Sequence, residues 1–106
     1  MPSRPVSRPE ICAAIEGLRL LEFRYKGKPR TVEPYCHGWN AHGEERLRAR
    51  QVGGETSSGY RFGKFWATTD MVDVRETDRP FVPDDPAYNP DDSAMAEIHC
   101  RVTARR

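Results

Sequence analysis

The chain lacks any long hydrophobic run, and this absence limits where it can reside. No window of the sequence approaches the roughly 18 consecutive apolar residues of a membrane span. The first nine residues also lack the apolar stretch of a signal peptide. We therefore expect a cytoplasmic protein that does not contact a membrane.

Cysteine is scarce and follows no framework spacing. The three cysteines, Cys12, Cys36 and Cys100, make an odd number and contain no C-x-x-C pair. This pattern argues against a secreted disulfide scaffold and favours reduced thiols.

Metal-binding spacing is absent as well. His37, His42 and His99 could join the cysteines in a zinc site, but neighbouring strand residues such as Cys36 and His37 point to opposite faces and cannot reach one ion. We predict no metal ion and no cofactor.

The sequence also lacks a catalytic arrangement. Gly53-Gly54 is not followed by the Lys-Ser/Thr of a phosphate-binding loop, and Cys36 cannot use His37 as a base if the two side chains face apart. We expect a protein that is not an enzyme, with a small hydrolase based on Cys36 or a metal ion as the remaining alternative.

Charge is plentiful but unevenly distributed. Charged residues make up 31% and hydrophobic residues 37% of the 106 residues, which suits a single domain with a modest core. Residues 1–64 carry twelve Lys/Arg and seven Asp/Glu, whereas residues 65–106 carry five and nine. An anionic partner would therefore dock on the first part of the chain.

A short helix is expected near the N-terminus. Ser7–Glu10 has the pattern of a capping box, which places the helix start at about residue 8. Apolar residues then recur on one helical face at Ile11, Ala14, Ile15 and Leu18. Gly17 weakens further continuation, so the helix should span two to three turns.

From Leu21 the hydrophobic period changes to two, which is the period of a strand. The expected strands are residues 21–25, 31–38, 45–52, 60–66 and 71–75, separated by turns and loops. Pro34 has no backbone N–H, so it must lie at an edge, an end or a bulge. These elements predict a mainly β fold with a short N-terminal helix and a small antiparallel barrel.

We divide the chain into an N-terminal arm with the helix cap (1–10), a barrel domain (11–82) and a Pro/Asp-rich C-terminal segment that packs on the barrel (83–106). Pro80–Pro90 is too rich in proline for regular structure. A helical turn is expected over Ser93–Glu97, and residues 101–106 are expected to fray.

Three arginines of the third expected strand form a row. Arg46, Arg48 and Arg50 alternate, so their side chains leave one face about 7 Å apart, a spacing suited to phosphates. The alternative is a solvated face in which they pair with glutamates of neighbouring strands, namely Glu22, Glu33, Glu44 or Glu45. The sequence leaves both open.

Aromatic side chains interleave with basic ones, as in barrels that stack bases and track a phosphate backbone. The aromatic residues concerned are Tyr25, Tyr35, Trp39, Tyr60, Phe62, Phe65 and Trp66. At least half of them must belong to the core of so small a domain. Trp39 and Tyr60, beside loops, are the better candidates for exposure.

The run LEFRYKGKPRTVEP (Leu21–Pro34) resembles the opening of the WYL domain, which typically reads F-x-Y-x-G-x-x-R-x-V-x-P. Similarity to short stand-alone bacterial members extends over about residues 11–100, and Glu45-Arg46-Leu47 stands at the name-giving Trp-Tyr-Leu. The resemblance implies an SH3-like (Sm-like) β-barrel in residues 11–82. It also implies ligand sensing or nucleic-acid binding in bacterial transcription regulation or defence.

The resemblance also implies a ligand groove. Tyr25 and Arg30 fall on the family's tyrosine and arginine, His37 on its strand-end histidine, and Lys64 near its later arginine. With ten residues ahead of Ile11, we expect no DNA-binding domain before the barrel, and hence a free sensor or a subunit that needs a partner.

We therefore expect a non-enzymatic module that binds a nucleotide or single-stranded nucleic acid by charge and stacking. The candidate ligand-binding residues are Tyr25, Arg30, His37, Arg48, Arg50 and Lys64. The alternative is a protein-interaction subunit or homodimer in a bacterial regulatory or defence system, docking through the strand edge near Pro34 or the loop Gly53–Gly59.

Overall fold

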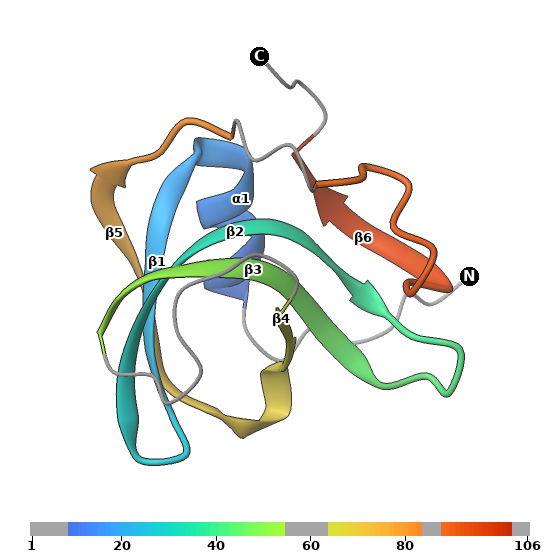
Figure 1. Ribbon diagram of the computed structural model, residues 1–106, viewed down its shortest axis with the longest axis horizontal. Helices are drawn as coiled ribbons and strands as arrows, with labels where there is room; N and C mark the ends of the chain where they lie inside the picture. The colour runs from blue at the N-terminus through green and yellow to red at the C-terminus, as the bar shows by residue number, and fades with distance from the viewer. Residues whose placement is uncertain (1–8, 55–63, 84–87, 103–106) are drawn as a thin grey trace.

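The fold is mainly β, with one short helix and one antiparallel sheet (Figure 1). A computed structural model describes residues 9–54, 64–83 and 88–102. The elements are α1 (Pro9–Gly17), β1 (Arg19–Tyr25), β2 (Lys28–Trp39), β3 (Glu45–Gly54), β4 (Lys64–Ala67), the short 3-10 helix η1 (Thr68–Asp70), β5 (Met71–Pro80) and β6 (Glu97–Arg101). The expected mainly β class, with a short N-terminal helix and an antiparallel sheet, is thereby confirmed. None of the described helices is long and apolar enough to cross a membrane.

Helix α1 has the face that its apolar spacing predicts. Ile11, Ala14 and Ile15 are buried, and the helix packs on β1, β2, β5 and β6. It ends at Gly17, and Leu18 adopts a left-handed φ of 55° that turns the chain into β1. Ser7 and Arg8 of the expected capping box lie outside the described residues.

Strand β2 organises the sheet, whose order is β4-β3-β2-β1-β5. Strand β3 runs along one edge of β2, while the other edge pairs first with β1 and then with β6. Between these two partners the register with β3 shifts, because Pro34 opposes Ala49 and Cys36 opposes Arg48, leaving Tyr35 as an extra residue. Pro34 therefore lies at a bulge, one of the three positions that its missing N–H allows.

The sheet is strongly curled, as shown by side chains of non-neighbouring strands that meet in the core. The ring centroid of Trp66 on β4 lies 5.2 Å from that of Phe23 and 4.9 Å from that of Tyr25, both on β1. In the described part of the chain, no pairing joins β4 to β5 to close the sheet. The barrel expected from the sequence is therefore not confirmed.

The C-terminal part contains a strand that local pattern did not indicate. The expected helical turn over Ser93–Glu97 is wrong: the Met95 N–H donates to the Asp92 carbonyl at 3.0 Å in a single turn, and β6 begins at Glu97. Gly38 makes the pairing of β6 possible, because a Cβ at that position would overlap the Glu97 carbonyl oxygen.

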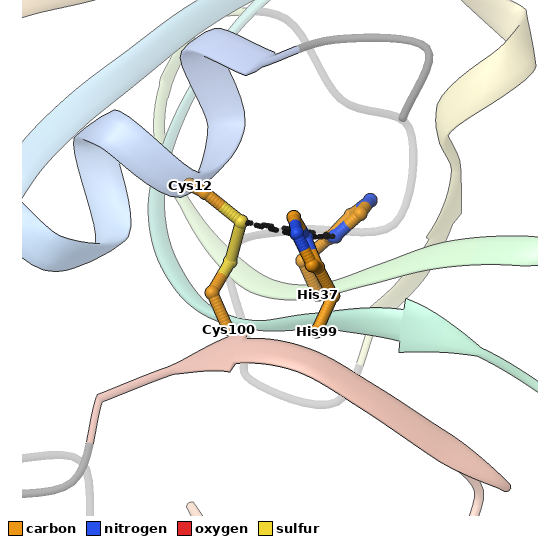
Figure 2. Close-up of side chains that lie close together, drawn as sticks. All are labelled: Cys12, His37, His99 and Cys100. Carbon is orange, nitrogen blue, oxygen red and sulfur yellow. Dashed lines mark hydrogen bonds between the residues drawn. A yellow bond between two sulfur atoms is a disulfide. The ribbon is translucent and has the colours of Figure 1, made fainter. Parts of the chain in front are cut away.

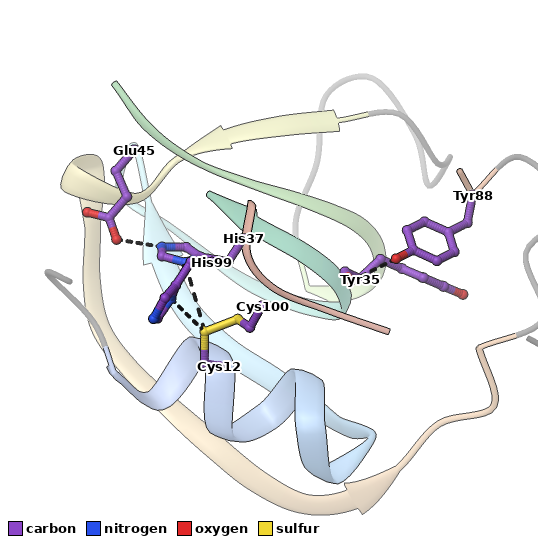
Figure 3. Close-up of a disulfide and its surroundings, with 7 residues drawn as sticks. All are labelled: Cys12, Tyr35, His37, Glu45, Tyr88, His99 and Cys100. Atoms are coloured by element: carbon purple, nitrogen blue, oxygen red, sulfur yellow. Dashed lines mark hydrogen bonds and ion pairs between the residues drawn. A yellow bond between two sulfur atoms is a disulfide. The ribbon is translucent and has the colours of Figure 1, made fainter. Parts of the chain in front are cut away.

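Tyr88 anchors the segment that leads into β6. Its hydroxyl donates to the Val102 carbonyl at 2.7 Å, and its ring centroid lies 4.8 Å from that of Tyr35 (Figure 3). Both tyrosines are buried. The segment is thus held to β2 by a buried side chain as well as by strand pairing.

Candidate functional site

The structure places five of the six predicted ligand-binding residues on two faces of the sheet. Along β3, burial alternates, so Arg46, Arg48 and Arg50 point to the outer face. Arg30 and His37 lie opposite the buried residues Phe23 and Leu47 in the register and so share the core-facing side. Tyr25 contacts Trp66 on that same side, and Lys64 begins β4 with a side chain outside the described part.

Arg30 is a buried residue that links β1, β3 and β4 inside the curled sheet. It is 8% exposed, and its guanidinium donates to Gln51 Oε1 at 3.2 Å and to the Tyr25 carbonyl at 3.4 Å. Its guanidinium carbon also lies 5.8 and 5.4 Å from the ring centroids of Tyr25 and Trp66, within range of a cation–π interaction. Its Nε has no hydrogen-bond partner among the described residues.

A cavity of about 360 Å³ lies beside Arg30. Its lining includes Glu22 and Asp73 as well as Arg24 and Arg75. With Arg30, three guanidinium groups and two carboxylates line the cavity, so its charge is nearly balanced and favours an anion only weakly.

The outer row of arginines is held by carboxylates. Arg48 donates from Nε to Asp92 Oδ2 at 2.8 Å and from Nη2 to Oδ1 at 3.3 Å, a two-point contact. Its guanidinium carbon lies 4.3 Å from the ring centroid of Phe65. Arg46 pairs with Glu44 at 3.1 Å, one of the partners expected for a solvated face, and Arg50 stands opposite Glu33 in the register.

Asp92, the partner of Arg48 in the row, belongs to the Pro/Asp-rich C-terminal segment that the sequence predicts to pack on the barrel. Burial by itself raises the pKa of its carboxyl, but hydrogen bonds from Arg48 and the Ala94 N–H, together with the Arg48 charge, bring that pKa below its ordinary value. Asp92 is therefore ionised at neutral pH and occupies the position that an anionic ligand of Arg48 would take.

A second cluster joins α1, β2 and β6. Cys12, His37, His99 and Cys100 each offer one ligand atom, and these atoms all lie within 4.8 Å of one another. Figure 2 shows the two imidazole rings turned toward the sulfur atoms. The set of two cysteines and two histidines is one that structural zinc sites use.

Cys12 and Cys100 form a disulfide in this structure, so the expectation of three reduced thiols is wrong for these two. They are 88 residues apart with Cα atoms 5.9 Å apart. Spacing could not reveal this pair, because it depends on the packing of α1 against β6. The third cysteine, Cys36, is free.

The rule that adjacent strand residues point to opposite faces did not predict this cluster, because β6 contains a bulge. His37 opposes Cys100 and Gly38 opposes Ile98, so His99 is an extra residue on β6. At such a bulge two residues face one on the partner strand, and the adjacent pair His99-Cys100 can point to one side. Between Cys36 and His37 the register of β2 has no shift, so Cys36 points away from the cluster as the same rule predicts.

His37 is the buried centre of the cluster. Its Nε2 lies 2.6 Å from Glu45 Oε2 (Figure 3), and it is fully buried. Burial, with a smaller contribution from His99, lowers the pKa of His37 although Glu45 opposes the shift. His37 is thus a neutral imidazole that donates from Nε2 to Glu45.

Trp39 packs against the two histidines of this cluster and does not face solvent. Its ring centroid lies 5.6 Å from that of His37 and 5.7 Å from that of His99, and it is 6% exposed. The prediction that Trp39 is exposed is therefore wrong, because β6 packs beside it. Tyr60 lies outside the described residues.

Cys36 has the environment of a packing residue. It is fully buried, and burial, with a contribution from Asp92, raises the pKa of its thiol to about 12. A nucleophilic cysteine needs the opposite shift, so this position offers little thiolate at neutral pH.

Comparisons of the chain with protein-family models, with curated proteins and with solved structures found no match. The fold and the clusters define a mainly β domain with an outer arginine row and a Cys/His cluster.

Proposed function

We propose that this protein is a non-enzymatic binding module that holds a nucleotide or single-stranded nucleic acid on the outer face of β3. The observation that carries the proposal is the row Arg46, Arg48 and Arg50, which leaves one face of the strand, with Phe65 packed against Arg48. Guanidinium groups bind phosphate oxygens, and an aromatic ring beside them offers a stacking surface for a base.

The carboxylates around the row support an exchange of anions. Arg48 and Asp92 are both mostly buried, with side chains 16% and 11% exposed. A phosphate that reaches Arg48 must displace Asp92, so the segment carrying Asp92 competes with the ligand. Ligand binding and release of that segment would then be coupled.

The fold family is part of the same proposal. We infer an SH3-like barrel of the WYL type, acting in the cytoplasm within a bacterial regulatory or defence system. The contacts of Trp66 with Phe23 and Tyr25 support a closed sheet, as does the short connection Thr68–Asp70 between β4 and β5. In this proposal Tyr25, Arg30 and His37 maintain the interior.

The test is a fluorescence-anisotropy titration of labelled short single-stranded DNA, RNA and cyclic nucleotides at low and moderate salt. Arg48→Ala/Arg50→Ala should weaken binding at least about tenfold, and wild-type affinity should fall steeply with salt. The matched control is Arg75→Ala/Arg79→Ala, which removes two arginines that pair with Glu22 on β1. Equal losses in both variants, or no binding by the wild type, would refute the proposal.

A second candidate is a protein-interaction module or homodimer. It is favoured by β5, which ends the sheet path within the described residues and carries Val72 with 55% of its surface exposed. Strand edges of this kind can accept a strand from another chain. Sedimentation velocity over a range of concentrations tests it. A dimer that forms without any nucleotide and is lost in Val72→Lys would favour this candidate.

A further inference from the structure

We propose that Cys12, His37, His99 and Cys100 bind one Zn²⁺ ion in a closed tetrahedral site when the two cysteines are reduced. The ligands come from α1, β2 and β6, so the ion would clamp the first helix and the last strand onto the centre of the sheet. Four protein ligands leave no open position for substrate, which makes this a structural site.

Three distances between ligand atoms are close to the edges of a zinc tetrahedron, and the two sulfur atoms, which are bonded to each other in the disulfide, separate when it is reduced. Ordinary Zn–N and Zn–S bonds give edges of about 3.4 Å between two nitrogens and about 3.6 Å between nitrogen and sulfur. The His37 and His99 Nδ1 atoms are 3.1 Å apart. Cys12 Sγ lies 3.1 Å from His99 Nδ1 and 3.9 Å from His37 Nδ1.

Glu45 orients His37 for this role. Because the carboxylate accepts the proton of His37 Nε2, the lone pair of the neutral ring lies on Nδ1, the atom that faces His99 and Cys12. A carboxylate behind a histidine ligand is the usual outer-shell arrangement of zinc proteins. In the metal-free protein His99 Nδ1–H can donate to the lone pair of His37 Nδ1 at 3.1 Å. When that proton moves to His99 Nε2, both Nδ1 atoms offer lone pairs to one cation.

The charge of the four ligands matches a divalent ion. Two thiolates and two neutral imidazoles sum to two negative charges, which Zn²⁺ neutralises in a site where His37 and Cys100 are buried. Trp39, packed against both imidazole rings, limits access of water. His99 is an exposed residue, so an ion can reach the site from its side.

The disulfide and zinc binding exclude each other, because both use the sulfur atoms of Cys12 and Cys100. A dithiol reductant transfers two electrons and two protons to the Cys12–Cys100 bond, yielding two thiols while it closes to its own disulfide. Zinc then displaces one proton from each thiol as it binds. In the reducing cytoplasm proposed above, disulfides are uncommon, so the zinc-bound state would prevail.

The test uses the full chain reduced with a dithiol, desalted without oxygen and titrated with Co²⁺ and then Zn²⁺. We expect about one Co²⁺ per chain, with strong visible absorption typical of tetrahedral cobalt, a thiolate-to-cobalt band and displacement by Zn²⁺. Protein with its disulfide intact should show no such uptake. No uptake by reduced protein, or equal uptake by oxidised protein, would overturn the proposal.

Variants separate the site from its surroundings. Cys100→Ser leaves Cys12 as the thiolate ligand, so the thiolate-to-cobalt band should fall to about half of its wild-type intensity or less. His99→Ala, at an exposed position, should weaken metal binding at least about tenfold without unfolding the protein. Cys36→Ser and His42→Ala remove the cysteine and histidine outside the cluster and should keep the wild-type spectrum. A spectrum unchanged in both cluster variants would place the metal elsewhere and refute the assignment.

Discussion

Asp92 and Arg48 lie 44 residues apart in the chain, yet two hydrogen bonds of 2.8 and 3.3 Å join them. The contact brings the acidic second part of the sequence onto the basic strand of the first part. Alternation across the sheet separates this outer row from the interior residues around Arg30.

Removing the Asp92 charge should strengthen anion binding at the row. Asp92→Asn frees Arg48 from its carboxylate, so the affinity for labelled single-stranded nucleic acid should rise at least about threefold in the anisotropy titration. Asp91→Asn is the matched control, because it removes the same charge from an 87%-exposed side chain that pairs with Arg101. An equal rise in both variants would mean that net charge alone is responsible.

The same pair predicts a pH dependence of stability. Since the pKa of Asp92 is lower in the folded protein than in the unfolded chain, its contribution is complete above the unfolded pKa of about 4 and disappears as the pH falls through the folded value. Urea unfolding should show wild type more stable than Asp92→Asn by about 1–3 kcal/mol at pH 7. The difference should shrink below pH ~4; a difference that persists into strong acid would contradict this assignment.

Glu45 should act on metal affinity through His37. Glu45→Gln should weaken Co²⁺ binding to the reduced protein by about 10- to 100-fold, measured by competition with a chelator, while the tetrahedral spectrum is retained because Glu45 is not a ligand. Glu44→Gln changes the same charge at the next position, where the side chain is 53% exposed, and should have no effect. Loss of the spectrum itself in Glu45→Gln would show a different role.

The thiol of Cys36 should not react with thiol reagents in the native protein. With the Cys12–Cys100 disulfide intact, it is the remaining free thiol and is fully buried. An aromatic disulfide reagent should therefore detect almost no thiol in native protein and about one per chain in guanidinium. Rapid labelling of the folded protein would contradict the burial of Cys36 and would make a nucleophilic role for its thiol a candidate again.

Gly38 should control the docking of β6. In Gly38→Ala the new methyl group meets the Glu97 carbonyl and Ile98 backbone, so stability should fall by about 1–3 kcal/mol, and the C-terminal strand should become sensitive to protease. Gly17→Ala is the control, since its Cβ would meet neighbours at 3.5 Å or more and the substitution should be neutral or slightly stabilising. Equal protease resistance in the two variants would refute the steric argument.

Local sequence pattern was sufficient for much of the fold. The apolar spacing from Ile11 to Ile15 places the buried face of α1, and alternation along β3 places its arginines on one side. Both follow from backbone periodicity, which acts over a few residues. Strands β2 and β5 extend beyond their predicted ends, because pairing with neighbours decides where a strand stops.

The sequence by itself thus determined the mainly β class, the N-terminal helix and the outward row of arginines. The tertiary structure alone decided the partner of Arg48, the pairing of β6 with β2 and the convergence of Cys12 with His99 and Cys100. These contacts span 44 or more residues, and a bulge in β6 reverses the facing rule at His99. Long-range packing and an extra residue in a strand leave no periodic trace in the sequence, which is why the Cys/His cluster emerges only when the chain is folded.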